Sequence, residues 1–127
     1  MQESITIVIP IPNKILSPNC MIASQRGRFM RAAAAKKCRR LAKAAVEEEQ
    51  LETLPWNFVE LRPSFYFKIN RKRDRNNYMS MLKSTIDGIV DAGLIPDDNS
   101  EHIREHWPEM LIDKNDPRVE ILIERLK

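Results

Sequence analysis

The sequence predicts one compact α/β (α+β) domain over residues 1–127, in which two helices pack against a mixed sheet of about four strands. Three observations predict this class. A chain of 127 residues suits a single domain. Stretches rich in β-branched residues alternate with stretches of helical periodicity. The elements follow the order strand, helix, strand, helix, strand, strand, which favours helices against a mostly antiparallel or mixed sheet.

The first strand and the first helix occupy the N-terminal half. Residues 5–9 read Ile-Thr-Ile-Val-Ile, a β-branched run that favours a strand. Three prolines then force an extended segment that ends in a Ser-Pro-Asn turn at residues 17–19. A long helix is predicted from about residue 29 to residue 51, because small and apolar residues recur on one face: Ala34, Cys38, Leu41 and Ala45.

A second strand and a second helix follow. Residues 59–69 carry apolar side chains at odd-numbered positions, which places them on one face of a strand. Pro63 interrupts this run and suggests an edge strand or a bulge. A helix is predicted at about residues 76–92, with Gly93 at the position that commonly ends a helix.

Two strands complete the chain. Residues 102–112 have the character of a strand that includes Trp107 and is interrupted at Pro108. Residues 119–123 alternate and turn Val119, Ile121 and Ile123 inward. A chain this short leaves much of its surface exposed, and small domains often gain stability by forming dimers.

Positive charge is concentrated in two stretches. The net charge is only +3, but residues 24–43 hold eight Lys or Arg and no acid. Residues 68–75 hold five more beside a single acid, Asp74. Such stretches are expected where a phosphate-rich partner binds. The alternative is a solvated basic helix face.

The second predicted helix carries a polar face opposite its apolar one. Asp74 precedes this helix, near the positive end of its dipole, and Asp97 and Asp98 follow it. Carboxylates that converge among basic residues suit Mg²⁺, which needs only one or two carboxylates and activates water. A lysine beside them would hold the phosphate. Four polar residues share the face at i, i+4, i+7 and i+11: Asn76, Ser80, Lys83 and Asp87.

Ordinary structural roles also explain these residues, and spacing alone favours them. In that interpretation Asp74 caps the helix. Lys83 and Asp87 form an exposed i,i+4 pair. Asp97 and Asp98 are turn residues.

Other chemistries find little support in the sequence. Cys20 and Cys38 are too few for a disulfide framework and lack zinc-ligand spacing, so we interpret them as semi-buried thiols of a reducing compartment. His102 and His106 have no third ligand nearby in the sequence. Three glycines leave no Gly-rich phosphate loop. No apolar run approaches the ~20 residues of a membrane span, and the first residues lack a basic signal region.

Several short motifs of the second half occur in a fixed order and resemble the RusA family of Holliday junction resolvases, particularly its phage-type members. The resemblance spans nearly the whole chain. It includes the proline-rich residues 9–19, the basic first helix and the closing strand at residues 117–120. The motifs are Arg73-Asp74-Arg75-Asn76-Asn77, Leu82-Lys83, Asp87-Gly88, Asp91-Ala92-Gly93-Leu94-Ile95 and Asp97-Asp98.

This resemblance implies a homodimeric, Mg²⁺-dependent endodeoxyribonuclease, with Mn²⁺ as an alternative metal, that cuts four-way DNA junctions in recombination and repair. It implies a cytoplasmic protein encoded by a bacterium or a phage. It assigns catalytic roles to Asp74, Asn76, Lys83 and Asp98, and metal binding to Asp74, Asn76, Asp97 and Asp98. The basic residues expected at the DNA are Lys14, Arg28, Arg31, Lys36, Arg39, Arg40, Arg71, Lys72, Arg73 and Arg75.

One position departs from the family motif, because Asn76 stands where a second aspartate is expected. An amide oxygen still ligates a metal, but it brings no negative charge. Either the residue is a deliberate change, or the protein is a weak or purely junction-binding relative, or a neighbouring acid such as Asp87 or Asp97 takes over. Two alternative functions therefore remain: a branched-DNA-binding protein with little catalysis, and a basic α/β protein that binds RNA or protein.

Overall fold

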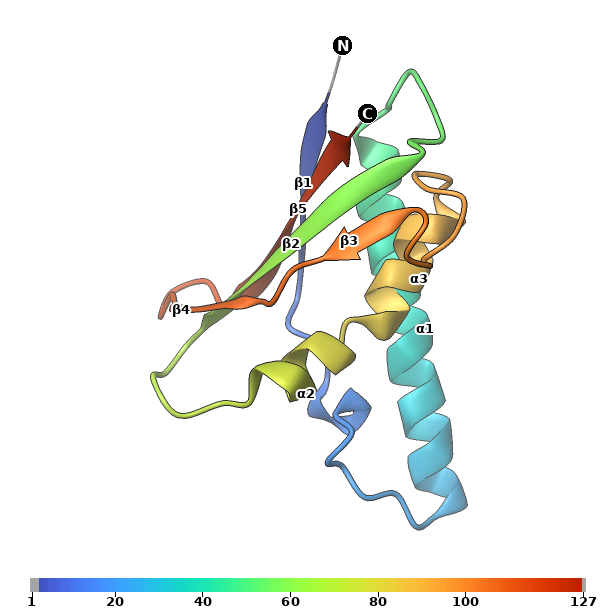
Figure 1. Cartoon of the computed structure of the whole chain (residues 1–127). Helices are drawn as coiled ribbons and strands as arrows, with labels where there is room; N and C mark the ends of the chain where they lie inside the picture. Colours follow the sequence, from blue (N-terminus) through green and yellow to red (C-terminus); the bar gives the residue numbers. More distant parts are fainter. Residues whose placement is uncertain (1–2, 127) are drawn as a thin grey trace.

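The computed structural model describes residues 3–126 and has a mixed sheet with helices against one face (Figure 1). The predicted α+β class is confirmed. The elements are β1 (Ser4–Ile9), the short 3₁₀ turn η1 (Lys14–Leu16), α1 (Gln25–Glu48), β2 (Phe58–Phe67), α2 (Arg75–Ser80), α3 (Lys83–Asp91), β3 (Ile103–Glu105), β4 (Glu109–Ile112) and β5 (Arg118–Leu126).

The sheet has the order β1-β5-β2-β3, and β4 continues alongside β2. The strands β1 and β2 both pair antiparallel with β5, whereas β3 and β4 run parallel to β2. The described sheet has five strands rather than about four, because residues 102–112 form two short strands.

The strand β2 is central, so Pro63 does not mark an edge strand. The pairing on one side of β2 is nevertheless interrupted at Pro63, and its register shifts there by one residue, as a bulge would produce. The Val59 N–H donates to the His102 carbonyl (2.9 Å), and the Phe67 carbonyl accepts from the Asp113 N–H (2.8 Å). Odd-numbered residues of β2 therefore direct their backbone groups toward β3 and β4. Pro63 belongs to the same set but has no N–H to donate. The neighbouring strand is interrupted opposite it: β3 pairs with residues 59–61 and β4 with residues 64–67.

Alternation along the three long strands builds the core. Odd-numbered residues of β1, β2 and β5, apart from Arg125, are buried under the helices, and even-numbered ones lie on the other, more exposed face. The inward orientation predicted for the last strand is confirmed, since Val119, Ile121 and Ile123 are fully buried.

The helix α1 begins four residues earlier than predicted and ends three residues earlier. Its N-cap is Ser24, whose hydroxyl accepts a hydrogen bond from the Gly27 N–H at 3.0 Å. The predicted apolar face is half-buried, and only Ala42 and Val46 are fully buried. The N-terminal half of α1 extends beyond the sheet (Figure 1). Within residues 3–126 no helix is both long and apolar enough to cross a membrane.

The second predicted helix is two helices rather than one, so the prediction of a continuous helix over residues 76–92 is wrong. A turn at Met81 and Leu82 separates α2 from α3, and the two helices run in different directions (Figure 1). The break lets α2 place Tyr78 edge-on against Phe65 and Phe67, while α3 packs on α1. Both turn residues are buried, which anchors the break in the core.

The helices α1 and α3 approach closely at Gly88. A Cβ atom at this position would lie 2.2 Å from the Arg39 carbonyl oxygen and 2.9 Å from the Ala42 Cβ. Position 88 therefore requires glycine, because the contact between the two helices leaves no room for a side chain. Gly93 needs glycine for a different reason, since its φ of +84° confirms the predicted helix-ending position.

These two glycines give a stability prediction. We expect Gly88→Ala to lower the free energy of unfolding by about 2 kcal/mol, because the methyl group forces α1 away from α3. We expect Gly93→Ala to cost about 1 kcal/mol, because it adds backbone strain but meets no atom within 4 Å. Urea unfolding measures both, and equal stability of Gly88→Ala and the parent would contradict the packing.

Candidate functional site

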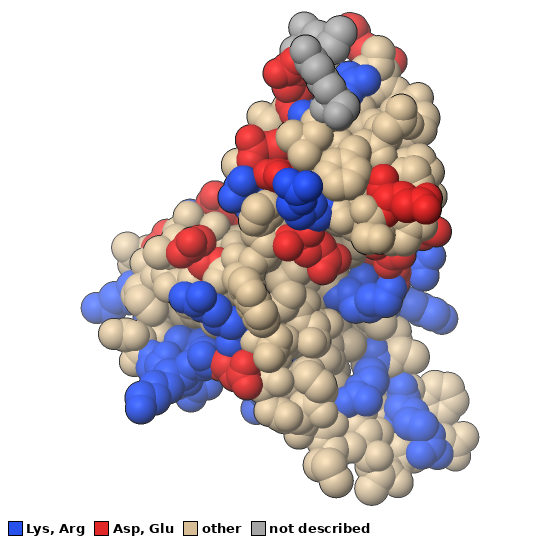
Figure 2. Space-filling model, viewed as in Figure 1, with Lys and Arg blue, Asp and Glu red and all other residues tan. Residues whose placement is uncertain are grey.

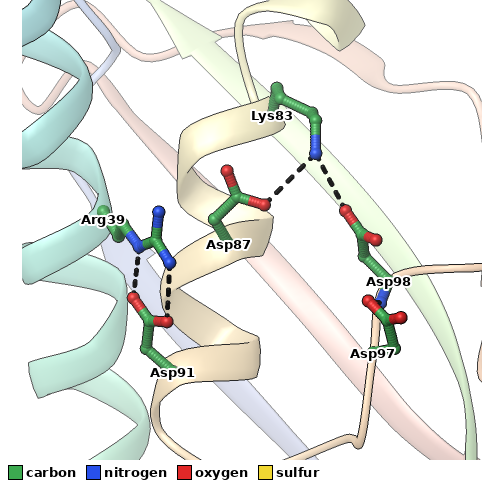
Figure 3. A network of polar contacts seen from close by, with 6 residues as sticks. All are labelled: Arg39, Lys83, Asp87, Asp91, Asp97 and Asp98. Atoms are coloured by element: carbon green, nitrogen blue, oxygen red, sulfur yellow. Dashed lines mark hydrogen bonds and ion pairs between the residues drawn. The ribbon is translucent and has the colours of Figure 1, made fainter.

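Lys83 lies at the centre of the candidate site, in the first turn of α3. Its Nζ atom is 3.2 Å from Asp87 Oδ1, one helical turn further on, and 2.9 Å from Asp98 Oδ2, in the loop that follows α3 (Figure 3). The i,i+4 pair that spacing predicted is therefore present. The chain also folds back after α3, as a site that includes Asp98 requires.

The loop that returns Asp98 is held by local contacts. After the reversal at Gly93, Leu94 and Ile95 are buried, and the Leu94 carbonyl accepts from the Trp56 N–H at 2.7 Å. The carboxylate of Asp97 accepts from the Asp98 N–H at 2.8 Å. Asp97 is thus a turn residue that orients Asp98.

The charges around Lys83 perturb one another. Hydrogen bonds to Asp98 and Asp87 raise the pKa of Lys83, and the bond from Lys83 lowers the pKa of Asp98. Glu105, at the end of β3, behaves differently. Partial burial and the negative charge of Asp98 raise the pKa of Glu105, while Lys83 opposes that rise. Because the Lys83 side chain is 70% exposed, the Lys83–Asp98 pair adds little stability and matters mainly for placing charge.

A surface hollow of about 580 Å³ opens beside Lys83. Three residues of the predicted polar face line it despite the break between α2 and α3: Asn76, Ser80 and Lys83. Three further residues, Glu105, His106 and Trp107, come from β3 and the segment after it. Sequence reasoning missed these three as site residues. Their only signal was the interrupted strand, because parallel pairing with β2 brings them to the hollow.

Asp74 has the structural role that spacing favoured, because it is the N-cap of α2. Its Oδ1 accepts a hydrogen bond from the Asn76 N–H at 2.9 Å. Asp74 is not among the residues that line the hollow, and neither are Asp87 and Asp98, whose carboxylates contact Lys83 at its edge. Within residues 3–126 no three His, Cys, Asp or Glu side chains gather as a ready metal cage. Of the expected metal residues, the structure brings Asn76 to the hollow and Asp98 to Lys83.

Three of the basic residues expected at DNA have internal contacts. Arg31 donates to the carbonyls of Ile15 (3.0 Å) and Cys20 (2.8 Å). Arg39 pairs with Asp91, as Figure 3 shows. Arg73 stacks on the Phe67 ring with 3.8 Å to its centroid. The other seven are exposed and form no ion pair in the part of the chain that the structure describes: Lys14, Arg28, Lys36, Arg40, Arg71, Lys72 and Arg75.

Charge is unevenly distributed over the surface. Figure 2 shows basic side chains gathered in two lower regions of the face, over the loop after β2 and over α1, with acidic side chains mainly above them. The two basic stretches of the sequence therefore remain two surface regions that flank the middle of this face.

Comparison with known proteins adds no assignment: no protein-family model matches the chain, and no curated protein matches it significantly. The resemblance to RusA resolvases therefore stays a prediction, and the function has to be argued from the site.

The site gives a titration prediction for protein in metal-free buffer. We expect Lys83→Met to raise the pKa of both Asp98 and Glu105, because each loses a neighbouring positive charge. We expect Asp98→Asn to lower the pKa of Glu105, because a like charge is removed. Carboxyl ¹³C NMR titrations measure both values. Any stability that Asp98 contributes is present above its unfolded pKa and disappears as the pH falls through its lowered folded pKa. Unchanged titration of Glu105 in both variants would contradict the arrangement.

Proposed function

We propose that this chain is a Mg²⁺-dependent endodeoxyribonuclease of RusA type that resolves four-way DNA junctions as a homodimer in the cytoplasm. The observation that carries the proposal is the position of Lys83. Its ammonium group lies between two carboxylates at the edge of a hollow, on a molecule with exposed basic regions. This combination of a phosphate-binding cation with hard oxygen donors suits phosphodiester cleavage.

The charge balance around Lys83, at the edge of the hollow, fits a divalent cation. Asp87 and Asp98 already outnumber the single positive charge of Lys83, and Glu105 adds a third carboxylate nearby. A phosphodiester approaching these groups alone would meet net negative charge. Carboxylate oxygens are the ligands Mg²⁺ prefers, and one or two suffice because the ion keeps several waters. Asp98 would hold the ion together with Glu105 or Asp87.

The chain's own groups have separable roles in this proposal. When bound, Mg²⁺ supplies an activated water and stabilises the departing oxygen. Lys83 donates hydrogen bonds to phosphate oxygens and offsets charge that develops on them. Asp97 fixes the orientation of Asp98 through the backbone N–H, and Asp74 fixes the start of α2, which carries Asn76.

The exposed basic residues suit the broad, phosphate-rich face of a branched DNA. Those of the loop and of α2 directly precede Asn76, which lines the hollow, and those of α1 form a second region (Figure 2). Binding through them should weaken steeply with salt, because each neutralised phosphate releases counterions. A two-fold dimer would place two such sites on symmetry-related strands, as paired nicks require.

Asn76 favours a second candidate, a branched-DNA-binding protein with weak or no cleavage. Asn76 lines the hollow but brings no charge, and the carboxylate of Asp74 already accepts the N-cap hydrogen bond. In that case the same basic surface regions bind junctions, but cleavage of the phosphodiester is slow.

Cleavage of a synthetic four-way junction tests the primary proposal. We expect nicking in Mg²⁺ or Mn²⁺, and a loss of at least roughly 100-fold in the single-turnover rate for Lys83→Met and Asp98→Asn. Asp116→Asn is the matched control, because Asp116 is 74% exposed in the turn before β5 and pairs with Arg118 rather than with Lys83. The proposal of an enzyme would be overturned if a folded dimer bound junctions but left them intact in both metals, even when the dimer carries Asn76→Asp.

Asn76→Asp separates the two candidates. We expect it to raise the nicking rate at least tenfold at limiting Mg²⁺, because it adds a carboxylate to the wall of the hollow. Asn77→Asp is the control, since it adds the same charge at a residue that does not line the hollow. Equal rates for the parent and Asn76→Asp would show that the amide is tolerated and would contradict the expected gain.

A further inference from the structure

We propose that Trp107 is a base-stacking surface at the mouth of the Lys83 hollow. In this arrangement a DNA base lies against the indole ring while the neighbouring phosphodiester meets Lys83. The inference rests on the proposed function and deepens it, because it names the part of the DNA that the site recognises: an unpaired or unstacked base at a branch point.

Trp107 is one of two strongly exposed aromatic residues among the described residues, and the other, Phe29 (68% exposed), lies on α1 and does not line the hollow. Trp107 is 59% exposed, whereas Trp56 is 1% exposed in the core. Several other rings are covered by an arginine guanidinium: Phe67 by Arg73, Phe58 by Arg104, Tyr66 by Arg118 and Trp56 by Arg125. Among the described residues no guanidinium and no second ring stacks on Trp107. The indole is therefore available to a ligand.

The segment that carries Trp107 is firmly held on both sides. The His106 N–H donates to the Leu61 carbonyl at 3.0 Å, which ties the segment to β2. Pro108 is buried and has a fixed φ. The gap opposite Pro63 forces this short connection between β3 and β4. A ring presented from such a segment loses little freedom when a ligand binds, which favours affinity.

The groups around Trp107 suit a nucleotide better than an apolar ligand. The hollow of about 580 Å³ lies in the range of small-molecule sites. Lys83 offers a cation for phosphate, and the Asn76 side-chain amide offers a donor and an acceptor for a base edge. Met79 and Ile86 supply apolar wall. The site thus pairs a flat aromatic surface with polar groups for both ends of a nucleotide.

A stacking surface of this kind discriminates between DNA structures. Bases in a continuous duplex are stacked on their neighbours and have no free face. Bases at a branch point are unstacked at lower cost, which is a source of selectivity. Stacking of one base on an aromatic side chain changes Kd by between about 5-fold and 150-fold. Trp107 should therefore strengthen binding to junctions and leave binding to linear duplex almost unchanged.

Fluorescence binding in EDTA tests this, because no cleavage occurs. The probes are a four-way junction and a linear duplex of the same sequence. We expect the junction to quench tryptophan emission in the parent but not in Trp107→Phe, which retains only buried Trp56. We expect Trp107→Ala to weaken junction binding by about 5-fold to 150-fold. Trp107→Phe should stay within about 3-fold of the parent because its ring also stacks, and the duplex Kd should not change.

Three results would overturn the inference. The stacking role would be excluded if Trp107→Ala bound the junction as tightly as the parent and the junction left the parent's tryptophan emission unchanged. The proposed function would survive that result, because junction cleavage tests it separately. A changed oligomeric state of Trp107→Ala in sedimentation, with unchanged affinity for DNA, would assign the indole to a contact between protein chains. No binding of the parent to either DNA would overturn both this inference and the proposed function.

Discussion

The ion pair between Lys83 and Asp98 is the interaction on which the candidate site depends. It joins the first turn of α3 to the loop that leaves the other end of that helix, at a distance of 2.9 Å. The pair forms because Gly93 reverses the chain and Leu94 and Ile95 bury themselves against the core. Since Lys83 is largely exposed, the pair contributes placement rather than stability. It brings a carboxylate from a distant position in the chain to the cation at the edge of the hollow.

Two backbone constraints decide what else reaches that hollow. Gly88 lets α3, the helix that carries Lys83, lie directly on α1. Pro63 offers no N–H toward the parallel side of β2, and the neighbouring strand is split there into β3 and β4. The split leaves a connection that carries His106 and Trp107 beside the helices. The composition of the site therefore follows from packing and from one missing hydrogen-bond donor.

Much of the fold was predictable because alternation and helical periodicity are local signals. The three long strands and α1 follow from such patterns, with Ser24 as the overlooked start of α1. The break between α2 and α3 was not predictable, because Met81 and Leu82 continue the apolar periodicity through it. The pairing of Lys83 with Asp98 could be expected from the motif resemblance. Glu105 and Trp107 could not, because parallel pairing of two very short strands is decided by tertiary contacts.

The central claim is that the Lys83 hollow binds a divalent cation when it holds a phosphodiester. Titration of Mn²⁺ into the complex with a four-way junction, followed by electron paramagnetic resonance at low temperature, tests it by measuring metal binding rather than cleavage. The account predicts a bound Mn²⁺ signal in the parent complex, with affinity at least roughly tenfold weaker in Asp98→Asn and unchanged in Asp116→Asn. Equal Mn²⁺ affinity in the parent and Asp98→Asn complexes would contradict it.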